Sequence, residues 1–190
     1  MVTMNLDLAV FQAVQSLTGI GFLDQLMIFA AEFLVFLVPL ALVYLWFQGR
    51  EGKKDSVLAF SSAMVGIFFS YLMGLVYFHQ NPSATLDTIV AAKPENAFPS
   101  QHTVVLFSIV WPLFWRDRRN IAFLALLAAL GTGFSRVYIG EHWPIDIIGS
   151  LIASAVGFGV LYLSEDYIDP FVEEAIDLAE TVEGKIFNLF

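Results

Sequence analysis

Residues 135–146, SRVYIGEHWPID, place Arg136, His142 and Asp146 within eleven positions of an otherwise apolar chain. The stretch ends one apolar run and precedes the next, so we expect a turn between two helices, with Pro144 in the first turn of the second. His142 and Asp146 are four residues apart at this helix start and can share one face. The carboxylate can then hold an imidazole nitrogen and orient the histidine for chemistry.

A second stretch, NAFPSQHT, carries Ser100 and His102 where a polar loop gives way to an apolar helix. The backbone N–H groups at this helix start would bind an anion. Arginine matches phosphate oxygens bidentately, so Arg136 together with two histidines and an aspartate suits phosphoryl transfer from a lipid headgroup better than acyl transfer. A metal site built from His102, His142 and Asp146 is the alternative.

The composition indicates an integral membrane protein. The 190 residues are 58% hydrophobic and only 14% charged, with a mean hydropathy of +0.73, which leaves too few polar residues to cover a soluble globule. Nineteen Phe and four Trp suit a lipid-facing surface with interfacial anchors. The absence of cysteine excludes disulfides and cysteine-ligated metals. We therefore expect an all-α, polytopic membrane helix bundle.

The apolar runs predict about five transmembrane helices. Their expected ranges are 22–47, 56–78, 103–115, 121–134 and 145–164. Helical spacing of apolar residues before the first run predicts an N-terminal interfacial helix, and residues 48–55 are expected to be a short polar loop. The longest loop, residues 79–101, is of a length that is usually functional in a compact membrane protein.

The net charge of −9 lies mostly in the tail, because residues 165–190 hold eight of the eighteen acidic residues. An apolar stripe with a period of about 3.5 residues predicts a C-terminal amphipathic helix there. We therefore expect a membrane-embedded domain, residues 1–165, followed by an acidic amphipathic helix, residues 166–190. Its acidity argues against binding to anionic lipid headgroups, which leaves packing on the bundle or pairing with another subunit.

Basic residues predict the topology. Six of the nine positive charges lie in two loops on one side of the bundle: Arg50, Lys53, Lys54, Arg116, Arg118 and Arg119. The positive-inside rule makes that side cytoplasmic. The opposite loops hold only Lys93 and Arg136, so both candidate stretches are expected at the extracytoplasmic face.

Two motifs resemble the signatures of one family. Pro99-Ser100-Gln101-His102 resembles PSxH, and Ser135-Arg136 followed by His142 and Asp146 resembles SRx5Hx3D, both from the type 2 phosphatidic acid phosphatase superfamily. A chance match to the four fixed residues of the second motif is on the order of one in a thousand for a chain of this size. The resemblance covers about residues 5–165 and is closest to the bacterial undecaprenyl pyrophosphate phosphatases of the membrane-bound branch.

The resemblance implies a role for each matched residue. His142 would be the nucleophile that forms a phosphohistidine, Asp146 would orient it, and His102 would protonate the departing oxygen. Arg136 and Ser100 would hold phosphate oxygens. These roles agree with the chemistry expected from the residues themselves, which is a nucleophile with its orienter, a separate acid and a donor cluster for the developing charge. They require no metal or other cofactor.

A third family signature, Kx6RP, is altered in this chain. The segment where it should fall reads Gly74 to Asn81-Pro82, so both of its cations are missing. Gln80 and Asn81 can donate hydrogen bonds there but supply no charge, and a charge-assisted bond contributes about 1.5–3 kcal/mol against about 1 for a neutral one. Lys93, the other cation at this face, is either an ordinary solvated loop lysine or, if the protein is an enzyme, folds back and supplies part of the missing charge.

Together these features predict dephosphorylation of a lipid phosphate or pyrophosphate at the outer face of the cell membrane, with undecaprenyl pyrophosphate favoured. The alternatives are a phosphatidic acid or phosphatidylglycerol phosphate phosphatase, and a non-catalytic lipid-binding protein. The expected partners are the lipid substrate, membrane lipid and a second copy paired through the C-terminal helix. No nucleic-acid partner is expected.

Overall fold

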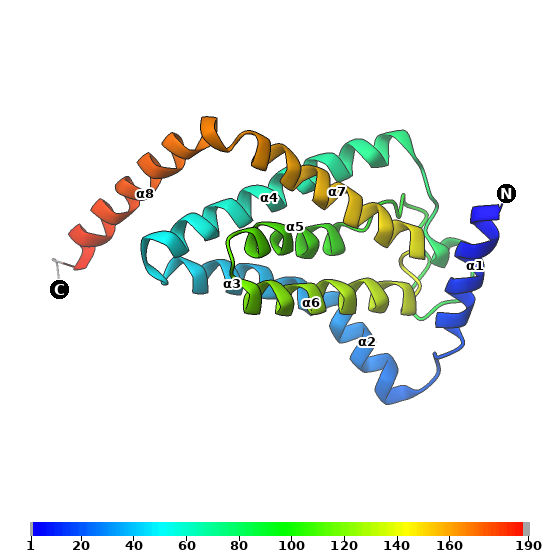
Figure 1. The fold of residues 1–190 in the computed structure, drawn as a ribbon. Helices are drawn as coiled ribbons and strands as arrows, with labels where there is room; N and C mark the ends of the chain where they lie inside the picture. Colours follow the sequence, from blue (N-terminus) through cyan, green and yellow to red (C-terminus); the bar gives the residue numbers. More distant parts are fainter. Residues whose placement is uncertain (1, 188–190) are drawn as a thin grey trace.

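The computed structural model describes residues 2–187, and it is a bundle of helices joined by tight turns and one long loop (Figure 1). The predicted all-α class is confirmed. The α-helices are α1 (Val2–Gln15), α2 (Gly21–Phe33), α3 (Leu37–Trp46), α4 (Gly49–Val76), α5 (Gln101–Trp115), α6 (Arg119–Tyr138), α7 (Pro144–Leu163) and α8 (Glu165–Phe187). Two short 3-10 helices, η1 (Leu34–Phe36) and η2 (Pro82–Ala84), complete the list for the described residues.

Four segments are long and apolar enough to cross a membrane. They are the continuous rod Gly21–Trp46, formed by α2, η1 and α3, and the helices α4, α6 and α7. The remaining predicted span, at residues 103–115, is the shorter apolar helix α5, which has 15 residues. α5 lies at the centre of the bundle and packs against α4, α6 and α7. The five apolar runs along the sequence thus correspond to four long helical segments around one short central helix.

Close packing of α4 against α7 fixes the position of α7, the helix whose first turn carries Asp146 of the SRx5Hx3D motif. A Cβ added at Gly157 would lie 2.7 Å from the backbone nitrogen of Gly66, so the two backbones approach too closely for larger side chains. The hydroxyl of Ser62 on α4 also donates a 2.7 Å hydrogen bond to the carbonyl of Ser108 on α5. These contacts position α5 and α7, which begin at the candidate site.

The predicted polar loop at residues 48–55 is wrong, because α4 begins at Gly49 and includes most of that stretch. Gly49 has a φ of 78° and makes the turn from α3, so no longer loop is needed. The polar side chains remain helical because each finds a charged partner. Asp55 accepts hydrogen bonds of 2.7 Å from Arg116 and 2.6 Å from Arg118, which places the two basic segments at the same end of the bundle.

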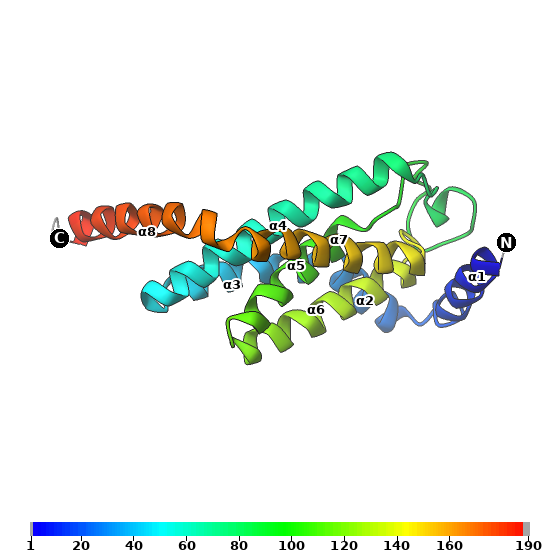
Figure 2. The same cartoon turned by 45° about the horizontal axis from the view of Figure 1, so that its top comes forward.

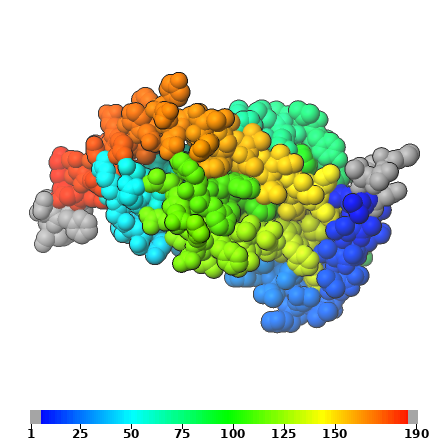
Figure 3. Space-filling view, in the orientation of Figure 1, coloured from blue at the N-terminus to red at the C-terminus, as the bar shows by residue number. Residues whose placement is uncertain are grey.

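The acidic helix α8 leaves that same end of the bundle, while α1 lies across the opposite end (Figures 1 and 2). The side of α8 that meets the bundle carries acidic residues and the fully buried Ile176, whereas the predicted apolar stripe faces away. Arg50 pairs with Glu173 at 2.5 Å and Lys53 with Glu183 at 2.6 Å, and Figure 3 shows α8 beside the first turns of α4. The stripe residues Phe171, Leu178 and Val182 are exposed, and the stripe positions 186 and 189 lie outside the described side chains.

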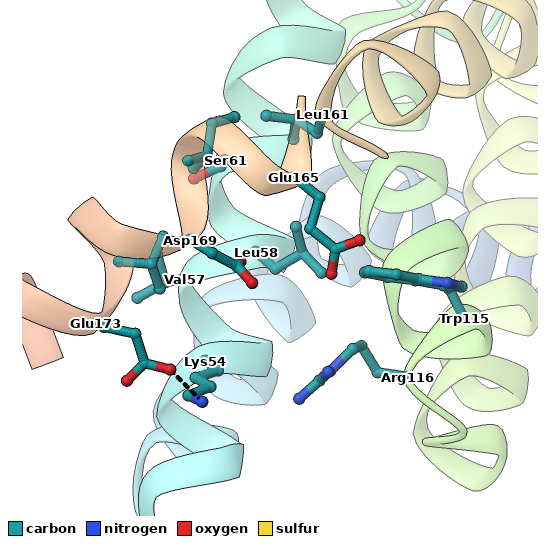
Figure 4. Close-up of a pocket in the computed structure, with 12 residues that line it drawn as sticks. Lys54, Val57, Leu58, Ser61, Trp115, Arg116, Leu161, Glu165, Asp169 and Glu173 are labelled. Atoms are coloured by element: carbon teal, nitrogen blue, oxygen red, sulfur yellow. Dashed lines mark ion pairs between the residues drawn. The ribbon is translucent and has the colours of Figure 1, made fainter. Parts of the chain in front are cut away.

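A small pocket of about 90 Å³ lies under the start of α8 (Figure 4). Lys54 and Arg116 line it together with Glu165 and Glu173, and the Lys54–Glu173 ion pair closes one side. Because these cations already pair with carboxylates of this chain, we interpret the pocket as a gap in the packing of α8 against the bundle and not as a ligand site.

Candidate active site

The candidate active site forms at the end of the bundle away from α8, where the loop between α4 and α5 meets the turn between α6 and α7. Two backbone hydrogen bonds join them, from Ser83 to Gly140 at 3.2 Å and from Val90 to Ile139 at 3.3 Å. Gly140 has a φ of 87°, and a Cβ there would lie 2.4 Å from atoms of Thr88. A glycine is therefore required both for the turn and for the approach of the loop.

His142 lies between an arginine and an aspartate. Its Nε2 is 3.3 Å from Nη2 of Arg136, and its Nδ1 is 3.5 Å from Oδ2 of Asp146. A guanidinium has only donors, so Nε2 must accept in this contact, and the neutral ring then carries its proton on Nδ1, toward the carboxylate. This is the tautomer in which Nε2 carries the lone pair, here directed at Arg136.

Asp146 is fully buried and is held by more partners than its sequence spacing indicated. Nδ1 of His79 lies 2.8 Å from Oδ1, and the backbone N–H of Trp143 donates to Oδ2 at 2.8 Å. The ring of His79 also stacks on Trp143, with centroids 5.4 Å apart. Sequence reasoning missed His79, although it is the first residue of the long loop that was expected to be functional.

Arg136 and Lys93 share a carboxylate that was also missed. Glu141 is only 2% exposed, and its two oxygens pair with Arg136 and with Lys93. Burial acts to raise the pKa of Glu141, but the charges of Arg136 and Lys93 outweigh it and hold that pKa below its usual range. Lys93 therefore folds back toward Arg136, and the carboxylate of Glu141 lies between the two cations. The signal available in the sequence was an acidic residue directly before His142.

Ser100 and His102 lie at the start of α5, beside the turn that carries His142. Ser100 is the N-cap residue and fully buried, and its hydroxyl accepts a 3.0 Å hydrogen bond from Thr103. Its carbonyl accepts a 2.9 Å hydrogen bond from Ser150 on α7, which ties the two helix starts together. His102 is half-buried in the first turn of α5.

Gln80 and Asn81 take part mainly in the fold of the loop. The carbonyl of Gln80 accepts a 2.8 Å hydrogen bond from the indole of Trp143. The side-chain oxygen of the buried Asn81 accepts from both the backbone and the hydroxyl of Ser83, at 3.0 and 2.7 Å, and so caps η2. The amide nitrogen of Asn81 is the donor that this side chain has left for an anion.

No metal cluster is evident in the part of the chain that the structure describes, since no three His, Cys, Asp or Glu side chains there are arranged to hold an ion.

An apolar cavity of about 830 Å³ lies between α3, α5 and α6, further along the bundle toward α8. Its lining includes Leu106, one helical turn from His102, and Leu34 of η1. Apolar chains of a lipid fit such a lining.

This site and this bundle define a class of protein. Residues 57–169 match the family model of the PAP2 superfamily, and the chain belongs to that superfamily. The expected enzyme class, a phosphatase of lipid phosphates in a membrane, is confirmed.

Several particular proteins are similar to this chain. Undecaprenyl-diphosphatase BcrC of Bacillus subtilis is 29% identical, with 93% of each chain covered. Putative undecaprenyl-diphosphatase YbjG of Escherichia coli is 30% identical over 80% of this chain and 79% of its own. Among solved structures, LpxE of Aquifex aeolicus is 21% identical with a TM-score of 0.67, and the match covers 82% of this chain and 93% of that one. This last similarity shows the fold alone.

Proposed function

We propose that the protein removes the terminal phosphate of a polyprenyl pyrophosphate such as undecaprenyl pyrophosphate, through a phosphohistidine on His142. The observation that carries this proposal is the position of His142, with Nε2 against Arg136 and Nδ1 facing Asp146. A nucleophilic nitrogen beside a phosphate-binding cation, with a carboxylate behind it, is the geometry that covalent phosphoryl transfer needs.

The reaction has two steps. The lone pair of His142 Nε2 attacks the terminal phosphorus, the bond to the bridging oxygen breaks, and protonated His102 gives its proton to the departing oxygen. Asp146 stabilises the positive charge that the ring of His142 gains. Water then attacks the phosphohistidine while His102 takes its proton, which releases inorganic phosphate and restores Nε2.

Cations and N–H groups stabilise the charge that develops on the phosphoryl oxygens. Arg136 binds them bidentately, Lys93 supplies a second charge, and Ser100 and the first N–H groups of α5 add neutral donors. Gln80 and Asn81 contribute at most neutral donors from the segment in which the family signature is altered. In this proposal no metal or cofactor takes part.

The substrate assignment rests on the relatives and on the apolar cavity. Two relatives of similar length are named undecaprenyl-diphosphatases, and the apolar cavity, which begins at Leu106 and runs toward the α8 end of the bundle, offers room for a lipid chain. Phosphatidylglycerol phosphate is the second candidate, because phosphatidylglycerophosphatase B of Escherichia coli is 32% identical over 46% of this chain. Phosphatidic acid would present the same terminal phosphate.

We further propose that the site faces the extracytoplasmic side of the cell membrane. The six basic residues gather at the α8 end, and the site lies at the other, so the positive-inside rule puts the site outside. Residues 1–165 would then hold the whole site, and residues 166–190 would be a cytoplasmic appendage.

The proposal is tested by phosphate release from purified protein given undecaprenyl pyrophosphate, phosphatidylglycerol phosphate or phosphatidic acid. We expect the highest kcat/KM with undecaprenyl pyrophosphate and none with a His142→Gln control. Highest activity on phosphatidylglycerol phosphate would favour the second candidate. No release from any substrate would leave the non-catalytic lipid-binding protein as the better account.

A further inference from the structure

The carboxylate of Glu141 occupies the space between the two cations that would hold a phosphate. One of its oxygens pairs with Nη2 of Arg136 and the other with Nζ of Lys93. The same Nη2 lies 3.3 Å from Nε2 of His142. The carboxylate thus bridges the two cations, as a phosphoryl group would, and one of its oxygens shares Nη2 of Arg136 with the nucleophilic nitrogen.

The pairing around Arg136 is also incomplete. The Arg136 side chain is only 10% exposed, and its buried Nε has no hydrogen-bond partner among the described residues. A buried donor without a partner is costly, and a ligand that brings a further oxygen would satisfy it. A tetrahedral phosphate, bound bidentately, has the oxygen that the planar carboxylate lacks.

We propose that Glu141 is a specificity residue: its carboxylate fills the phosphoryl position of the free site and must be displaced by the substrate. This inference rests on the proposed function and adds to it which headgroups gain entry. Lys93, with a side chain that is 48% exposed, marks the side on which the site opens to water and on which the carboxylate can leave.

Charge decides which ligands displace it. A terminal phosphate carries a charge of about −1.5 to −2 at pH 7, whereas a phosphodiester carries about −1, no more than the carboxylate itself. A terminal phosphate therefore gains more from Arg136 and Lys93 than Glu141 does. Phosphodiester headgroups, which surround the protein in the membrane, gain no more than Glu141 and stay out.

The test is direct binding of inorganic phosphate and of dimethyl phosphate to the full chain in detergent, measured by calorimetry on the wild type and on Glu141→Gln. The variant should bind inorganic phosphate at least about tenfold more tightly, since one charge-assisted competitor has been removed. Dimethyl phosphate should bind the variant measurably and the wild type far more weakly. Glu95→Gln, an exposed change in the loop that carries Lys93, should match the wild type.

Glu141→Asp is the second variant, because its shorter side chain keeps the charge but cannot bridge both cations, and it should also bind phosphate more tightly. Unchanged or weaker phosphate binding in a folded variant would overturn the proposal. Failure of both variants to fold would also contradict it, since a group that leaves its partners in every cycle cannot be essential to the fold. Binding needs no turnover, so a protein inactive on every lipid would defeat the proposed function and still answer this question.

Discussion

Nη2 of Arg136 lies 3.3 Å from Nε2 of His142, while Nδ1 of the same ring faces Asp146. The contact joins the end of α6 to the turn before α7, across the tight turn at Gly140. Because arginine can only donate, it selects the neutral tautomer with a lone pair on Nε2. The residue that would bind the phosphate thus also prepares the nucleophile.

Lys93 is predicted to supply charge to the phosphate, in place of the altered Kx6RP signature. Lys93→Met should lower kcat/KM by about tenfold to a hundredfold, the worth of one charge-assisted bond. Asn81→Arg should offset part of this loss, and Arg136→Ala should be worse than either single change. Phosphate release by the variants, with folding checked by thermal melting, measures this. A Lys93→Met protein as active as the wild type would show that Arg136 and neutral donors suffice.

His79 is predicted to position Asp146. His79→Ala should lower kcat by about tenfold with little change in KM, because one hydrogen bond to the buried carboxylate is lost and the substrate is not touched. His79→Asn, whose amide nitrogen can take the place of Nδ1, should recover most of the rate. Should KM rise while kcat stays constant, His79 would be a substrate-binding residue instead.

The topology is predicted to place the site outside. The chain has no cysteine, so single introduced cysteines give labelling without background. Asp87→Cys in the exposed part of the site loop should react with a membrane-impermeant reagent on intact cells, and Arg119→Cys at the other end should not. The reverse pattern would invert the topology and place the chemistry at the cytoplasmic face.

The acidic tail is predicted to stabilise the bundle in a pH-dependent way. Hydrogen bonds from Lys54 and Arg50 lower the pKa of Glu173 below its ordinary 4.5, and Lys53 and Trp46 do the same for Glu183. Depressed carboxyl pKa values give stability that is complete above about 4.5 and is lost as the pH falls through the lowered values. Deletion of residues 166–190 should therefore lower Tm at pH 7 by a few degrees and leave kcat within about twofold. The Tm difference should shrink in acid, where only the packing of the buried Ile176 is left to contribute; a difference independent of pH would assign the whole effect to apolar packing.

Pairing of two copies through the tail stays a prediction. The acidic face of α8 is already used against α4, so a second copy would have to meet the exposed stripe of Phe171, Leu178 and Val182.

Local spacing predicted the part of the site that lies on one segment. The four-residue interval between His142 and Asp146, and Pro144 at the helix start, are enough to place both side chains near one another. Apolar runs likewise predicted the helices, apart from the start of α4. There the charges of residues 50–55 suggested a loop, because their partners on α8 and in the α5–α6 turn lie far away in the sequence.

The contacts that complete the site could not be read from spacing. His79 precedes Asp146 by 67 positions and reaches it only because the long loop folds back on the α6–α7 turn. Glu141 is adjacent to His142 in sequence, yet its role depends on Arg136 and Lys93 arriving on either side. Such long-range pairings are set by tertiary packing.

The most direct test of the account is to trap the covalent intermediate. Purified protein is mixed with undecaprenyl pyrophosphate carrying labelled terminal phosphate, quenched in base within one turnover, and digested for mass spectrometry. We predict one phosphoryl group on His142, stable in base and labile in acid, and none in Asp146→Asn beyond a small fraction of the wild-type amount. Full activity without any labelled histidine, or a label on a residue other than His142, would contradict the mechanism.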